Sequence, residues 1–159
     1  MMRQNLRIPG PTPCPPEVLE AVGRPMINHR GPEFKELIYR VTDRLKRVFE
    51  TKEDLFILTA SGTGVMEAAV VNTLSPGDRV LGVTAGAFGD RFCDIAQVFG
   101  AEVTRLEAAW GDVVAPEQVR QALARDPALK AVLVVHNETS TGVTHDLESI
   151  ATVVKGEFG

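Results

Sequence analysis

The chain has 159 residues, of which 44% are hydrophobic and 24% charged, and its net charge is −4. This size suits one domain with a proper core, and the composition is ordinary for a soluble globular protein. Because the balance is slightly acidic and no basic block occurs, nucleic acid and anionic membranes are not expected as partners.

The sequence indicates neither a membrane-spanning protein nor a secreted one. No stretch approaches the roughly 18 apolar residues of a membrane span, and the first residues lack the apolar core of a signal peptide. We therefore expect a cytoplasmic protein that has no membrane partner. Cys14 and Cys93 lie too far apart in sequence to predict a metal knuckle or a redox pair, so both are expected to be reduced thiols and no metal site is predicted.

The first part of the chain is rich in proline and glycine. Proline fixes φ and removes an amide donor, so residues 1–30 are predicted to form an N-terminal arm with one short helix near 17–22. From Glu33 to Val48 the apolar residues recur at helical spacing, with charged residues between them, which predicts an amphipathic helix. This helix begins the second predicted region, residues 31–159.

Strands and helices then alternate. Apolar runs predict strands, and helical periodicity predicts helices between them. This alternation indicates an α/β fold with an open, mainly parallel sheet and flanking helices. The strands are expected at 55–60, 79–84, 102–107 and 130–136, and the helices at 64–74, at 87–99, from Pro116 and from about Asp146.

A corner rich in small residues follows the first predicted strand, in the segment "TASGTGVMEAAV". Ligands of open α/β sheets bind beyond the carboxyl ends of the strands, where unpaired helix amides and the helix dipole favour a phosphate. Ser61, Gly62 and Thr63 are therefore predicted to hold a phosphate. An ordinary helix cap at Ser61 is the alternative interpretation.

Two known phosphate motifs do not fit this corner. A Walker loop needs a lysine after its last glycine, where Val65 stands. A dinucleotide fingerprint needs a small residue where Glu67 stands, and an acidic residue at the end of the next strand.

Two more strand ends carry polar or aromatic residues. "TAGAFGDR" places Phe88 between two glycines, where its ring could cover a flat ligand or, alternatively, the core. "HNETSTGV" brings several polar groups to the same edge, which could bind a ligand or their own backbone. Arg91 is expected to be a solvated helix residue. Together the three strand ends predict a site for a planar, phosphorylated ligand.

These segments resemble the class V aminotransferases, which are fold-type I pyridoxal-phosphate enzymes, and within them the alanine–glyoxylate and serine–glyoxylate aminotransferases. The resemblance extends over about residues 5–154. The segments that carry it, in the family's order and spacing, are "PGPTPCPPEVLEAV", "NHRGPEF", "SGTGVMEAAVVNTLSPGDRVL", "GAFGDRF" and "HNETSTGV".

The resemblance implies roles for individual residues. The three residues of the corner would hold the phosphate of pyridoxal 5'-phosphate, Phe88 would stack on its pyridine ring, and Thr139 would bond near its phenolic oxygen. Gly10, in the arm, would lie near the substrate carboxylate. The resemblance also implies a homodimer, because the family's arm crosses to a partner subunit.

One part of the family's pattern is missing. The lysine that forms a Schiff base with the cofactor, the aspartate that pairs with the pyridine nitrogen and an arginine for the substrate all follow the "ETSTG" loop in the family. After that loop this chain has a single lysine, Lys155, before any further strand. We therefore expect the N-terminal part of such an enzyme, without a catalytic residue of its own and inactive alone.

The expected parent enzyme transfers an amino group between a small amino acid, alanine or serine, and an oxo acid such as glyoxylate. Two alternatives stay open at this stage. The parent could be another class V enzyme, such as a cysteine desulfurase or a phosphonate transaminase, or the chain could be a non-catalytic domain that binds a phosphorylated ligand.

Overall fold

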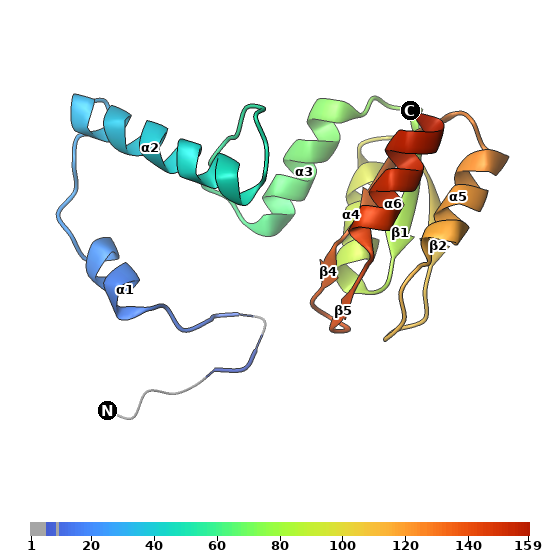
Figure 1. Ribbon diagram of the computed structural model, residues 1–159, viewed down its shortest axis with the longest axis horizontal. Helices are drawn as coiled ribbons and strands as arrows, with labels where there is room; N and C mark the ends of the chain where they lie inside the picture. The colour runs from blue at the N-terminus through green and yellow to red at the C-terminus, as the bar shows by residue number, and fades with distance from the viewer. Residues whose placement is uncertain (1–5, 9) are drawn as a thin grey trace. The chain divides into compact units, whose positions relative to one another are not determined.

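The computed structural model describes residues 6–8 and 10–159, and the chain divides into two compact units, Met1–Thr59 and Ala60–Gly159 (Figure 1). The first unit contains helices α1 (Pro16–Val22) and α2 (Pro32–Val48), which both have proline in the first turn. Proline is suited to this position because its missing amide would have no partner there. The short helix and the amphipathic helix predicted from the sequence are confirmed.

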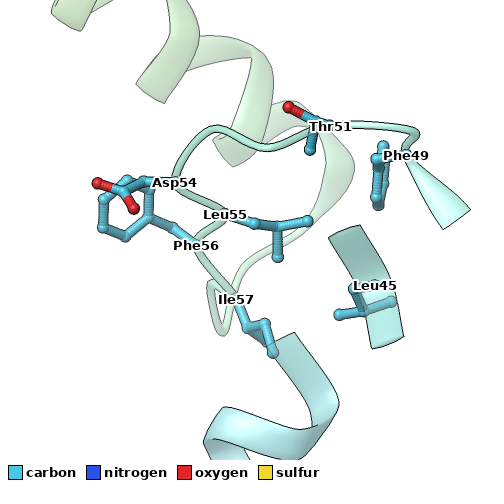
Figure 2. Close-up of a pocket in the computed structure, with 7 residues that line it drawn as sticks. All are labelled: Leu45, Phe49, Thr51, Asp54, Leu55, Phe56 and Ile57. Atoms are coloured by element: carbon cyan, nitrogen blue, oxygen red, sulfur yellow. The ribbon is translucent and has the colours of Figure 1, made fainter. Parts of the chain in front are cut away.

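The strand predicted at residues 55–60 is wrong. No hydrogen-bonded strand partner exists for this segment among the described residues, and a lone strand cannot satisfy its own backbone. The segment instead folds beside the end of α2 around a cavity of about 560 Å³. Figure 2 shows Leu45, Leu55 and Ile57 directed toward this hollow. Phe56, Ile57 and Leu58 remain at least half exposed, so this apolar run is neither a strand nor a buried segment.

The second unit is a three-stranded parallel sheet with helices on both faces (Figure 1). The strand order is β2-β1-β3, so β1 is central and is buried along nearly its whole length. This confirms the α/β class and the parallel sheet. The strands are β1 (Arg79–Thr84), β2 (Glu102–Glu107) and β3 (Leu129–Val134).

The helices of this unit lie close to the predicted ranges. Helix α3 begins two residues earlier than predicted, which makes Gly62 and Thr63 its first two residues. After α6 the chain continues as one π-helical turn, Val154–Phe158. No helix in the described part of the chain is long and apolar enough to cross a bilayer. The bounds are α3 (Gly62–Thr73), α4 (Ala87–Val98), α5 (Pro116–Arg125) and α6 (Leu147–Val153).

Alternating residues of β1 divide the core into two layers. Leu81 and Val83 pack with α5 and α6, whereas Val80 packs with α3 and α4. The alternation follows from the two-residue period of a strand. Gly82 faces α4 so closely that a side-chain carbon there would overlap the sulfur of Cys93, so α4 lies directly on the central strand.

Residues 136–145 fold differently from the predicted polar loop. They form a small antiparallel hairpin of β4 (Asn137–Glu138) and β5 (Val143–Thr144), with its turn at residues 139–142. Gly142 has a φ of +74°, a backbone conformation that favours glycine. The hairpin follows β3 and therefore lies at the carboxyl edge of the sheet, where the sequence predicted a ligand.

Candidate functional site

The amino end of α3 offers unpaired backbone donors. Ser61 caps this helix, and its hydroxyl accepts a hydrogen bond from the amide of Gly64 at 3.2 Å. The cap that the sequence offered as the alternative interpretation of this corner is therefore present. No described residue accepts a hydrogen bond from the amide of Gly62 or Thr63, and a side-chain carbon built on Gly62 meets no atom within 4 Å. The cap leaves these two donors without an acceptor at the positive end of the helix dipole.

Arg91 connects this corner to Phe88. Its Nη1 donates to the hydroxyl of Thr63 at 3.1 Å, and its guanidinium carbon lies 5.1 Å from the centroid of the Phe88 ring. Arg91 is exposed, as expected, but it is also the contact through which the two predicted parts of the site meet. A guanidinium over an aromatic face is held by electrostatic attraction to the ring.

The amino end of α4 is arranged in the opposite way, because side chains of the hairpin cover its amides. The Oε2 atom of Glu138 accepts hydrogen bonds from the amides of Phe88 and Gly89 at 3.1 and 2.9 Å. The hydroxyl of Ser140 accepts from the amide of Ala87 at 2.9 Å and donates to Oε1 of Glu138 at 2.6 Å. The first three amides of α4 are therefore all bound within the protein.

Glu138 is an ionised carboxylate in this position. Only 1% of the residue is exposed. Burial by itself would raise the pKa of Glu138, but hydrogen bonds from Ser140, from the Gly89 amide and from the Phe88 amide outweigh it and hold the pKa below its usual value. The negative charge then lies against the positive end of the α4 dipole, where it is stabilised.

The remaining predicted residues lie in two different places. Thr139 is exposed in the hairpin turn, between Glu138 and Ser140, which both bond to the start of α4. The structure thus brings Thr139 to the same end of α4 as Phe88. Gly10 is an exposed residue of the first unit.

Sequence reasoning missed the two residues that organise this edge, Glu138 and Arg91. Glu138 was one of several polar residues in "HNETSTGV", and its partners Phe88 and Gly89 precede it by 50 and 49 positions. No local spacing reports such a contact. A lone acidic residue four positions after the end of β3 is the signal that could have singled out Glu138 as a helix cap.

Comparison with known proteins agrees with this arrangement of a parallel sheet and flanking helices. The family described as aminotransferase class-V matches residues 6–157. The chain belongs to this family. Its parallel sheet and flanking helices are therefore those of a class-V aminotransferase.

Individual class-V aminotransferases are similar over nearly the whole chain. An uncharacterized aminotransferase of Methanocaldococcus jannaschii is 44% identical over 97% of this chain and 40% of its own length. A serine–glyoxylate aminotransferase of Methylorubrum extorquens is 39% identical over 96% of this chain and 39% of its own length.

A solved structure shows the same fold. The crystal structure of ureidoglycine–glyoxylate aminotransferase from Bacillus subtilis superimposes with a TM-score of 0.90 and 31% identity, covering 96% of this chain and 39% of that one. The chain thus spans about 40% of the length of the curated relatives that it matches.

Proposed function

We propose that the complete protein is a pyridoxal-phosphate-dependent transaminase. It transfers an amino group between a small amino acid, alanine or serine, and an oxo acid such as glyoxylate, and it works as a homodimer. Membership of the class-V family supports the reaction type. Glyoxylate is named as the acceptor in both the serine and the ureidoglycine relative, whereas the donor differs, which supports glyoxylate more strongly than either donor.

The observation that carries this proposal is the amino end of α3. The amides of Gly62 and Thr63 are without acceptors in the described chain, and a side-chain carbon on Gly62 would meet no atom within 4 Å. Several charge-assisted hydrogen bonds are what a phosphate requires. The hydroxyls of Ser61 and Thr63 add possible donors. The residues present therefore fit the phosphate of the cofactor.

The remaining predicted residues have roles at the cofactor ring and at the substrate. The half-buried ring of Phe88 would cover the flat pyridine ring, and Thr139, at the same end of α4, would donate to its phenolic oxygen. Gly10 would approach the carboxylate of the substrate. When bound, pyridoxal phosphate supplies the electron sink that takes up and passes on the amino group.

Titration with inorganic phosphate and with pyridoxal phosphate tests the site directly. Both ligands should shift the backbone amide resonances of Gly62 and Thr63 in the chain. Ser61→Asp keeps a helix cap but places a carboxylate where the phosphate would lie, so the affinity should fall roughly tenfold or more. Ser61→Asn is the matched neutral cap and should bind nearly as the wild type does. Equal binding by all three proteins would contradict the site.

We also expect the chain alone to be inactive. Purified chain mixed with pyridoxal phosphate, alanine and glyoxylate should form no glycine above the level without protein. Clear turnover would overturn this part of the proposal while leaving the phosphate site untouched.

A further inference from the structure

Glu138 and Ser140 cover the amino end of α4 through hydrogen bonds that use both carboxylate oxygens and the serine hydroxyl. Oε1 of Glu138 accepts from both the amide and the hydroxyl of Ser140, at 3.1 and 2.6 Å, while Oε2 binds two amides of α4. Thr141 adds a third connection, because its hydroxyl donates to the carbonyl oxygen of Ala85 at 2.9 Å. The hairpin turn is thereby tied to the end of β1 and to the start of α4.

The fit between the hairpin and α4 is tight. A side-chain carbon on Gly86 would overlap Oγ of Ser140 and would come within 2.9 Å of Cγ of Glu138. The carboxylate therefore occupies the space in front of the α4 amides, and no external anion reaches them. At α3 no described residue accepts a hydrogen bond from the amide of Gly62 or Thr63, and a side-chain carbon on Gly62, the first residue of the helix, meets nothing within 4 Å.

We propose that Glu138 is a positioning residue that acts as an internal anion. It fills the amino end of α4, holds the backbone of Phe88 in the orientation that presents its ring, and leaves α3 as the helix end that receives an external phosphate. The proposal rests on the phosphate site proposed at α3, but it concerns a different pair of amides, those of Phe88 and Gly89.

The structure offers a direct test, because a small carboxylate can replace a missing one. Glu138→Ala opens the space in front of α4 without adding charge. In this variant, inorganic phosphate should bind at α4 and shift the amide resonances of Phe88 and Gly89, with an affinity roughly tenfold or more above that of the wild type at this position. Formate should compete with phosphate there and return both resonances toward their wild-type positions.

Glu148→Gln is the matched control. Glu148 is an exposed acid in the first turn of α6, so its removal changes the net charge equally and also affects a helix end. Formate and phosphate should leave the Phe88 and Gly89 resonances of this variant unchanged, as in the wild type.

The outcomes separate the two proposals. If the folded Glu138→Ala variant shows no response of Phe88 and Gly89 to phosphate or formate, the role of Glu138 as an internal anion is wrong. If those amides respond but Gly62 and Thr63 do not respond in the wild type, the α3 site is wrong and the role of Glu138 at α4 stands. If Glu138→Ala is unfolded, formate at constant ionic strength should restore its circular dichroism. A variant that stays unfolded in formate contradicts the proposal, because loss of packing alone is not repaired by a free anion.

Discussion

Helices α3 and α4 begin side by side, joined by the contact of Arg91 with Thr63, yet their first amides have different surroundings. At α3 a short-range cap satisfies a single amide, that of Gly64, and leaves Gly62 and Thr63 open. At α4 two side chains from about fifty residues away satisfy the first three amides. Equal helix dipoles therefore do not make equal binding sites. Whether a helix end can bind an external anion depends on whether the protein already supplies an anion of its own there.

Adding a methyl group at each helix end should test the difference between the two ends most clearly. Gly86→Ala places a carbon against Ser140 and Glu138, so we expect the free energy of unfolding to fall by about 3 kcal/mol. Gly62→Ala adds the same carbon in open space at α3 and should change the stability by less than about 0.5 kcal/mol. Urea unfolding followed by circular dichroism measures both. Similar losses in the two variants would mean that the ends do not differ in this way.

The charge at α4 should make stability depend on pH. The folded pKa of Glu138 lies below its usual value of 4.5, so its carboxylate stabilises the fold above that pH, and the contribution is lost as the pH falls through the folded pKa. At neutral pH, Glu138→Gln should be less stable than the wild type by about 2 kcal/mol. Unfolding in acid should show this difference shrinking as the wild-type carboxylate is protonated. A difference that stays constant into acid would show that charge is not its cause.

A smaller loss than at α4 should come from removing the cap of α3. Ser61→Ala removes the acceptor for the Gly64 amide and should cost about 1 kcal/mol, whereas Ser61→Asn should restore most of it. Thermal unfolding of both variants gives the comparison. A loss as large as that of Gly86→Ala would indicate that Ser61 holds more than its own helix.

Much of the second unit could be predicted because its signals are local. The segments predicted as strands at 79–84 and 102–107 are strands, and Pro116 opens a helix as its fixed φ suggests. The cap at Ser61 also depends on residues three apart. The run at 55–60 is more apolar than either of these strands but forms no strand, because a strand needs a hydrogen-bonded partner that composition does not report.

The α/β class, the parallel sheet, most helix bounds and the glycine-rich corner at α3 could be predicted from the sequence. Each of them depends on periodicity or on neighbours within one turn. The tertiary structure alone decided that Glu138 reaches Phe88 and Gly89, that Arg91 links Phe88 to Thr63, and that α4 is closed while α3 is open. The hydrogen bonds that make these connections join residues from 28 to 53 positions apart. The sheet brings the carboxyl ends of its strands together in space. Spacing along the chain does not predict which side chains are then in contact.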